Sequence, residues 1–217
     1  EVRDNALAFF NAQGRVVSKD DYMIRTMTMP SNYGSVAKAY ATQDEKLNVS
    51  DTNNRLRNPF AVSLYTLSYD ANKSLVKTNP ATKENIKNYL SPYRLLTDSV
   101  TIKNAYIINV GVDFEILTLP GFNSNDVLLK SIKRVQQFFN IDDWQINQPI
   151  ILSDLYTELS TIMGLQSIVK IEVFNLQDVQ SGYSGNIYDI NQATRNQVIY
   201  PSLDPSIFEI KYPNSDI

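Results

Sequence analysis

The sequence predicts an α+β protein made of two small tandem α/β-sandwich units, with helices on one face of each small mixed sheet, and an extended C-terminal arm. Segments of helical and strand periodicity follow each other in the order α-β-β-α-β and then β-α-α-β. The 217 residues, 43% of them hydrophobic, are enough to form one or two globular cores. The predicted parts are 1–14, the end of a preceding helix; 15–103, the first α+β unit; 104–176, the second unit with order β-α-α-β; and 177–217, an irregular segment with the arm.

Two helical segments are expected at the start of the chain. Residues 2–12 have the apolar spacing of an amphipathic helix, which Gly14 would end. Ser18 begins the next helix, and Asp21 stands three residues later in an arrangement like a capping box. Ser18 and Asp21 are therefore interpreted as structural residues. The side chains expected to face the core from this second helix are Tyr22, Ile24 and Met27.

Two strands and a helix complete the first unit. Residues 36–43 predict a strand with three alanines on one face, and residues 60–69 predict a second strand rich in β-branched and aromatic side chains. The polar stretch 44–58 between them is long enough to be a functional or mobile loop. Pro80 opens a helix that ends before Pro92. Its expected inward side chains are Ile86, Tyr89 and Leu90.

The clearest strand of the second unit covers residues 106–116. Even positions are apolar and odd positions include polar residues such as Asn109, which predicts a single buried face. Val100 and Ile102 keep the same phase, so two strands or one bent strand share this run. Two helices should follow, one from Asn123 through residue 139 and one capped by Ser153, and then a strand over 167–174. The expected inward residues are Leu128, Ile132, Val135 and Phe139, then Leu155, Leu159 and Ile162, and finally Val169, Ile171 and Val173.

The arm covers residues 199–214, where three prolines bias the chain away from helix. Its large aromatic side chains are costly to leave in water, so they should dock on the arm's own unit or on a neighbouring subunit. Docking at a subunit boundary is the favoured alternative. The residues predicted to make this interaction are Tyr200, Pro201, Asp204, Pro205, Phe208 and Tyr212.

Composition excludes several kinds of chemistry. The chain has no histidine and no cysteine, so it holds no Ser-His-Asp triad, no thiol nucleophile and no disulfide. A site made only of carboxylates remains conceivable, but none of the 23 Asp and Glu stands in a distinctive pair. We therefore expect no enzymatic activity, no cofactor, no metal and no small-molecule substrate. The net charge of −3 argues against nucleic acid as a partner, and no apolar run is long enough to span a membrane.

Three segments, in this order, carry a resemblance to a known family. They are Arg15-Val-Val-Ser-Lys-Asp-Asp-Tyr22, Tyr93-Arg-Leu-Leu-Thr-Asp-Ser-Val100, and the arm's Tyr200-Pro-Ser-Leu-Asp-Pro-Ser-Ile-Phe-Glu-Ile-Lys-Tyr-Pro213. Together they resemble the large baseplate wedge subunit of T-even-type contractile-tailed bacteriophages, which belongs to the baseplate J-like family. Because the chain begins at a glutamate and has no terminating feature, we expect it to be part of a longer polypeptide.

The resemblance implies a structural role in the virion, in a tail baseplate assembled in the host cytoplasm. Such subunits associate with themselves, which predicts a homodimer within a ring, and with other wedge proteins. They join wedges into a ring around the hub and relay the change that triggers sheath contraction. The alternative is a glycosidase-type tail domain that uses two carboxylates in an aromatic-lined groove. A binding module for peptide or nucleic acid is a third class, disfavoured by the charge and by the lack of a basic-aromatic cluster.

Overall fold

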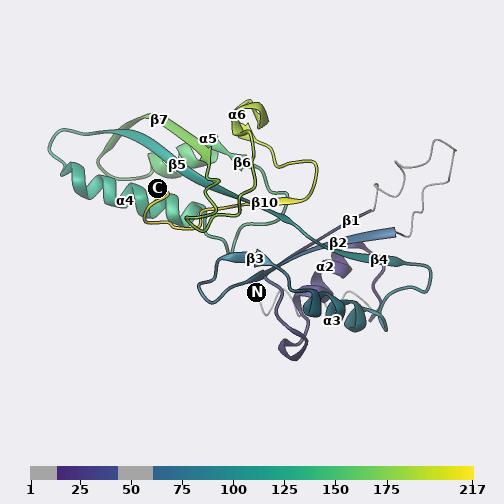
Figure 1. Ribbon diagram of the computed structural model, residues 1–217. Coiled ribbons are helices and arrows are strands. Elements are labelled where there is room, and N and C mark those ends of the chain that lie inside the picture. The colour runs from purple at the N-terminus through teal and green to yellow at the C-terminus, as the bar shows by residue number, and fades with distance from the viewer. Residues whose placement is uncertain (1–13, 44–60) are drawn as a thin grey trace. The chain divides into compact units, whose positions relative to one another are not determined.

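The structure is a computed structural model that describes residues 14–43 and 61–217 (Figure 1). It is an α+β protein, which confirms the predicted fold class. The helix expected at 2–12 and the loop expected at 44–58 lie outside the described residues. Contacts divide the chain into two compact units, residues 1–105 (unit 1) and 106–217 (unit 2). Residues 177–217, predicted as a separate part, therefore belong to the second unit.

Unit 1 is a small mixed sheet with helices packed against it. Strand β2 is central, because it pairs antiparallel with β1 and β3 and parallel with β4. Helix α2 contacts β1 and β2, and α3 contacts α2 and β4. The elements are α2 (Lys19–Met27), the 3-10 turn η1 (Ser31–Tyr33), β1 (Lys38–Gln43), β2 (Ala61–Tyr69), β3 (Leu75–Lys77), α3 (Pro80–Leu90) and β4 (Ser99–Asn104).

Helix α2 begins as the sequence predicts but buries a different face. Ser18 is its N-cap, and the hydroxyl of Ser18 accepts from the backbone N–H of Asp21, whose carboxylate accepts from the N–H of Ser18. The expected inward positions are only partly right: Tyr22 is buried, whereas Met27 is exposed. Positions one turn from Tyr22 are the ones that share its face. The buried residues at those positions are Arg25 and Thr26.

The sheet of unit 1 contains one strand that the sequence pattern did not reveal. The alanines of β1 are buried together as expected, but the short strand β3 was not predicted. It follows a turn in which the carboxylate of Asp70 accepts from the N–H groups of Asn72 and Ser74, while Lys73 has a positive φ of 62°. Three residues are too few to give a periodic signal, so only the Asp70 turn could have indicated this hairpin.

Unit 2 holds a three-stranded sheet in the order β10-β5-β7 and a second small sheet in the order β6-β9-β8. Helices α4 and α5 pack on each other, α4 contacts β5, and α5 contacts β7. The elements are β5 (Tyr106–Thr118), α4 (Ser124–Phe138), β6 (Ile150–Ile151), α5 (Leu152–Ser160), β7 (Leu165–Asn175), α6 (Ile190–Ala193), β8 (Thr194–Arg195), β9 (Val198–Ile199) and β10 (Ser206–Glu209).

Three expectations for unit 2 are wrong in detail. Leu128 is exposed, because the buried stripe of α4 runs through Val127 instead. Ser153 lies inside α5, whose N-cap is Ile151 without a side-chain bond. Val169 is exposed because the register shifts there: Glu115 pairs with Lys170 and Ile116 with Ile168, which leaves Val169 as the extra residue of a β-bulge. The order of helices and strands is unaffected by these shifts.

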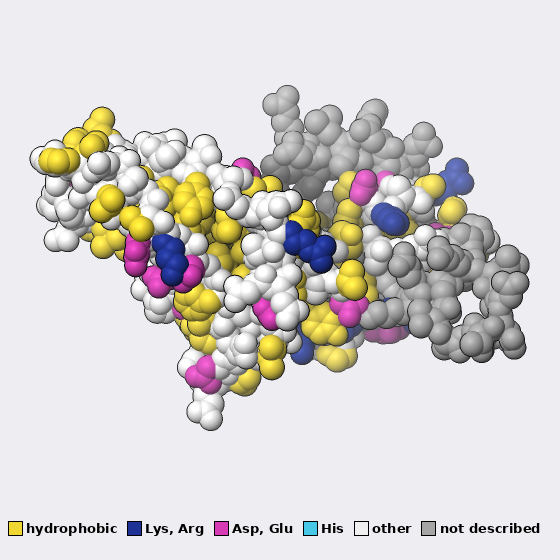
Figure 2. All heavy atoms as spheres, turned by 90° about the horizontal axis from the view of Figure 1, so that it is seen from above, with side chains coloured by type: hydrophobic (Ala, Val, Ile, Leu, Met, Phe, Trp, Pro, Cys, Tyr) yellow, Lys and Arg dark blue, Asp and Glu magenta, His cyan; other side chains and the backbone are white. Residues whose placement is uncertain are grey.

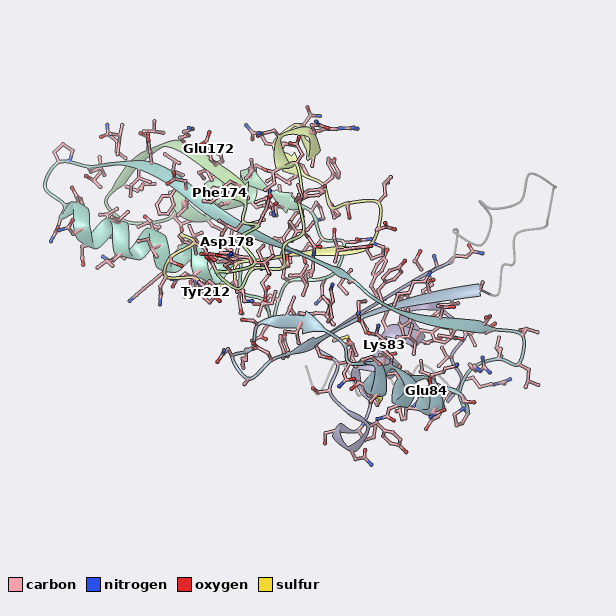
Figure 3. The ribbon with its side chains drawn as sticks, viewed as in Figure 1. Lys83, Glu84, Glu172, Phe174, Asp178 and Tyr212 are labelled. Carbon is pink, nitrogen blue, oxygen red and sulfur yellow. The ribbon has the colours of Figure 1, made fainter. Side chains whose placement is uncertain are left out.

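Strand β5 is buried on both faces over residues 107–112, whereas one buried face was expected. The odd-numbered Asn109 and Gly111 are inside as well as the even-numbered positions. Gly111 is needed for this packing, since a Cβ there would lie only 2.6 Å from a ring carbon of Phe174 on β7 (Figure 3). Beyond residue 112 the outward positions Asp113, Glu115 and Leu117 are exposed, as in a sheet with one solvated face.

The segment between β7 and β10 contains structure that was expected to be irregular. Helix α6 is followed at once by the hairpin β8-β9, which turns through Asn196 and Gln197 with φ values of 52° and 61°. Two consecutive positive φ values define the tight turn that favours strand hairpins. Asn-Gln lacks the glycine that usually marks such a turn in a sequence, so the hairpin was missed.

Candidate assembly surfaces

The terminal segment, which we define as residues 177–217, is built into unit 2. Strand β10 pairs parallel with the start of β5, with Ser206 opposite Tyr106 and Glu209 opposite Asn109. Ile207 and Phe208 are fully buried, and the ring of Phe208 meets the edge of the Tyr188 ring at 5.9 Å between centroids. The favoured expectation that Phe208 docks at a subunit boundary is therefore corrected. Its ring is covered by its own unit.

Asn109 joins the terminal segment to the sheet through buried hydrogen bonds. Its side-chain amide donates to the carboxylate of Glu209 at 3.0 Å, and its side-chain oxygen accepts from the backbone N–H of Ser184 at 2.7 Å. Its backbone carbonyl accepts from Asn175 and from the N–H of Leu176. Sequence periodicity placed Asn109 on an exposed face, and no signal in the local pattern shows that the chain returns to cover it.

Asp216 fixes the last residues of unit 2. Its buried carboxylate accepts from the hydroxyl of Tyr183 at 2.7 Å and from the N–H of Tyr212 at 2.9 Å. Its backbone carbonyl accepts from the N–H of Val112, which extends the contact along β5. Burial, together with the hydrogen bond to Asp216, raises the pKa of Tyr183 to about 12. Figure 3 labels Tyr212 and Asp178 in this part of unit 2.

The structure separates the six predicted interaction residues into three groups by their burial. Pro205 and Phe208 are buried in unit 2 and cannot act as free anchors. Tyr200 and Tyr212 keep 50% and 42% of their surface exposed, so the expected burial of these rings is not provided by the chain itself. Their burial against a partner stays a prediction. Pro201 and Asp204 are half-buried.

An apolar hollow lies beside the exposed part of the terminal segment. It has a volume of about 420 Å³ and is formed between the start of β5 and two loops of the terminal segment. We call it the β5 hollow. Its rim is apolar, since Leu203 is fully exposed and Ile187 is 80% exposed. Its main lining residues are Tyr106, Ile108, Ile187, Tyr188, Leu203 and Asp204.

Unit 2 exposes apolar side chains at a second place, at the end where β5 leads into α4. Phe122 and Leu119 are partly exposed and Met163 is 77% exposed, and the backbone N–H of Leu119 donates to the carbonyl of Gly164 beside Met163. Figure 2 shows hydrophobic side chains gathered at this end of the unit. Scattered exposed apolar residues are normal, whereas grouped ones are a feature of interaction surfaces.

In unit 1, two of the segments that carry the family resemblance meet. Val16 forms a parallel bridge with Arg94, and its N–H donates to the carbonyl of Tyr93 at 3.0 Å. The hydroxyl of Tyr22 donates to the carboxylate of Asp98 at 2.7 Å, and both residues are buried. Burial and this hydrogen bond raise the pKa of Tyr22 well above its usual value.

A further contact strengthens this junction, and apolar residues lie on its surface. The guanidinium of Arg25 lies over the Tyr93 ring at 4.1 Å from the centroid, a cation–π arrangement. Next to it, Val17 is 68% exposed and Leu96, at the tip of the turn from Leu95 to Asp98, is fully exposed. The junction is therefore held by buried contacts, and on its surface Val17 and Leu96 are exposed beside charged side chains.

Within residues 14–43 and 61–217 no group of three or more His, Cys, Asp or Glu side chains is placed to hold a metal. In the same residues, no helix is long and apolar enough to cross a membrane. The expectation that the chain is not an enzyme stays a prediction.

The fold of this chain is similar to one found in a solved structure. No family model matches the sequence, and no curated protein matches it. Among solved structures, the chain is similar to a chain of the anti-feeding prophage (AFP) baseplate, determined by cryo-electron microscopy with six-fold symmetry applied. The TM-score is 0.57 at 10% sequence identity, over 91% of this chain. The match spans 38% of the length of the AFP protein, and it shows a shared fold.

Proposed function

We propose that this chain is a structural part of a phage tail baseplate. The observation that carries the proposal is the fold likeness to an AFP baseplate chain over 91% of the residues. Fold likeness alone is a weak indication of function. It agrees here with the independent resemblance of three ordered sequence segments to baseplate wedge subunits, two of which meet at Val16 and Arg94.

The finer role in this proposal is the one implied by the wedge resemblance. The chain associates with itself and with other wedge proteins, joins wedges into a ring around the hub, and relays the change that precedes sheath contraction. It is incorporated into the virion after assembly in the host cytoplasm. Exposed apolar groups on both units provide surfaces for such contacts. We further propose that the chain has no catalytic role.

The test is to locate the protein in tailed particles. Antibodies against the chain, used for electron-microscopic labelling of particles from the source virus, should mark the end of the tail. Deletion of the coding region should yield particles without complete tails, and supplying the gene in trans should restore them. Label on the head alone, or normal tails in the deletion strain, would contradict the proposal. Polysaccharide cleavage by the purified chain that a single Asp or Glu substitution abolishes would favour the glycosidase alternative instead.

A further inference from the structure

Strand β7 lies at the edge of its sheet, and some of its backbone groups point away from β5. Successive residues of an antiparallel pair alternate between bonding to the partner strand and pointing outward. The N–H of Leu176 donates to the carbonyl of Asn109, and the register below this bond runs without a shift past Ile171. Ile171 and Val173 fall on the alternate positions. Their N–H and C=O groups therefore point toward the open side of β7.

The bonding of β5 agrees with this assignment. Val112, which lies opposite Val173, donates its N–H to the carbonyl of Asp216 instead of to β7. Strand β7 pairs with no second strand, and within the described residues the outward groups of Ile171 and Val173 form no hydrogen bond. An edge with such unpaired groups is a template for one more strand.

The two halves of this edge differ in how well they are protected from pairing. The first half has the bulge at Val169 followed by Lys170, and bulges and lysines are features that keep edge strands from pairing. Residues 171–174 contain no bulge, no proline and no lysine. The second half of β7 is therefore the part that can accept a strand.

A groove of about 480 Å³ runs along this second half. Four consecutive residues of β7 line it, although their side chains alternate between the two faces of the sheet, so the groove lies against the edge of the strand itself. The opposite wall is mainly apolar and is formed by the start of α5, by α6 and by β9. We call it the β7 groove, and its main lining residues are Ile171, Val173, Phe174, Leu152, Ile190 and Ile199.

The solvated face beside the groove carries an excess of negative charge. Asp113 lies opposite Glu172, and Glu115 lies opposite Lys170, so the four side chains share one face (Glu172 is labelled in Figure 3). Glu172 pairs with Lys170 at 2.7 Å, whereas the carboxylates of Asp113 and Glu115 form no hydrogen bond or ion pair within the described residues. The hydrogen bond to Glu172 and the charges of Glu115 and Asp113 raise the pKa of Lys170. One cation among three carboxylates leaves this face complementary to a further positive charge.

We propose that the open edge of β7 binds an extended segment of a different protein, which joins the sheet as one more strand. The backbone of the partner bonds to Ile171 and Val173, its apolar side chains on one face enter the β7 groove, and its Lys or Arg side chains on the other face lie beside Glu172. In strand addition of this kind, main-chain bonds give affinity and pockets for alternate side chains give specificity. A second copy fits poorly, because pairing two β7 edges brings like charges together. The inference goes beyond the proposed baseplate role and does not depend on it.

The probe is a synthetic peptide with blocked ends, Lys-Val-Lys-Val-Lys-Val-Lys, whose alternate residues supply the apolar and the basic face. The control for charge is Glu-Val-Glu-Val-Glu-Val-Glu. Two further versions of the lysine peptide carry N-methyl groups either on every valine or on every lysine, so that each lacks the N–H donors of one edge and keeps those of the other. Only one of the two should bind, and the one that binds shows whether the added strand runs parallel or antiparallel to β7.

Two protein variants locate the site. Asn191→Trp places a ring in the β7 groove, because Asn191 is an exposed lining residue on α6. Gln192→Trp makes the same change at the next position, which is also exposed and lies outside the lining. Both positions are on the surface, so the fold should tolerate the changes. Affinity for the lysine peptide should fall by about tenfold or more in Asn191→Trp, because the ring displaces a bound side chain, and should stay unchanged in Gln192→Trp.

The measurement is nuclear magnetic resonance of the 217-residue chain, with peptide titration for affinity and hydrogen exchange of single amides for the contact. In the free chain, the amides of Ile171 and Val173 should exchange faster than those of Glu172 and Phe174, which face β5. The lysine peptide should slow exchange most at Ile171 and Val173. The glutamate peptide and one of the methylated peptides should bind about tenfold more weakly.

Other outcomes overturn the inference. Unchanged exchange at Ile171 and Val173 at every peptide concentration would refute strand addition. Slow exchange of these amides in the dilute free chain would mean that the chain covers its own edge, and slowing that follows protein concentration alone would make a second copy the occupant. Equal binding of the two methylated peptides, or equal losses in Asn191→Trp and Gln192→Trp, would reduce the binding to unspecific attraction of a basic peptide to an acidic surface.

Discussion

Units 1 and 2 each hold a buried side-chain hydrogen bond between residues far apart in the sequence, but the second partner lies in a different kind of segment in the two units. In unit 1, Tyr22 reaches Asp98, and both belong to segments that lie within the sheet-and-helix framework. In unit 2, Asn109 reaches Glu209, one hundred residues away, in the last strand. Unit 2 is therefore completed only when its final residues return to β5. Aromatic residues of the terminal segment can thus be part of a core. The exposed fraction of each side chain shows which of them remain accessible to a partner.

The largest effect is expected from removing the buried ring of β10, because unit 2 depends on this strand for its core. Phe208→Ala should lower the free energy of unfolding by about 3–5 kcal/mol, because a fully buried ring is lost. Trp144, the single tryptophan, is buried in unit 2, so its fluorescence in urea reports on that unit. Leu203→Ala, a fully exposed position in the same segment, is the control and should change little. Equal effects of the two substitutions would contradict the structure.

The hydrogen bond between Tyr22 and Asp98 should stabilise unit 1 without affecting the stability of unit 2. Tyr22→Phe removes the hydroxyl that donates to the buried Asp98 carboxylate, and should cost about 1.5–3 kcal/mol. Circular dichroism, which follows both units, should show the loss. The urea concentration at the midpoint of the Trp144 fluorescence transition should not change. A shift of the Trp144 transition by the same amount would mean that the two units unfold as one.

Unit 2 should also lose stability at high pH. The raised pKa of Tyr183, about 12 against 10 for a free tyrosine, means that the folded unit holds this proton more tightly than the unfolded chain. The stabilisation is complete below pH 10 and declines as pH rises toward 12. Trp144-monitored unfolding at about pH 9 and about pH 11, on either side of the free tyrosine value, should show a decrease that is smaller in Tyr183→Phe. An equal decrease in both proteins would assign the effect to other groups.

The smallest effect is expected at the start of α2. Ser18→Ala removes the N-cap hydroxyl and should cost about 1 kcal/mol, confined to unit 1. Burial raises the pKa of the partner Asp21, but the hydrogen bonds from Ser18 and Val17 outweigh it and lower that pKa. Ser18→Asp, which preserves a capping oxygen, should keep most of the stability. A large association defect in Ser18→Ala at unchanged stability would instead assign Ser18 to an interface.

Sequence reasoning succeeded where the determinants are local. The Ser18 cap, the alanine face of β1 and the order of long helices and strands follow from periodicity and from residues a few positions apart. It failed where distant chain segments decide the environment. The burial of Asn109 depends on residues 175–209, and the bulge at Val169 depends on the register with β5. The exposed Leu96, absent from the predicted interaction residues, carries no signal except its place at a turn tip.

Hydrogen exchange of the dilute, intact chain tests most directly whether the terminal segment belongs to its own unit. The amides of residues 107–109 and 206–209 lie on paired strands, so they should be protected to a similar degree. We expect that protection to be the same at concentrations where the protein is monomeric and where it associates. Protection of residues 206–209 that appears only on association would show that the last strand docks on a neighbouring copy, and would contradict its place in the sheet of unit 2.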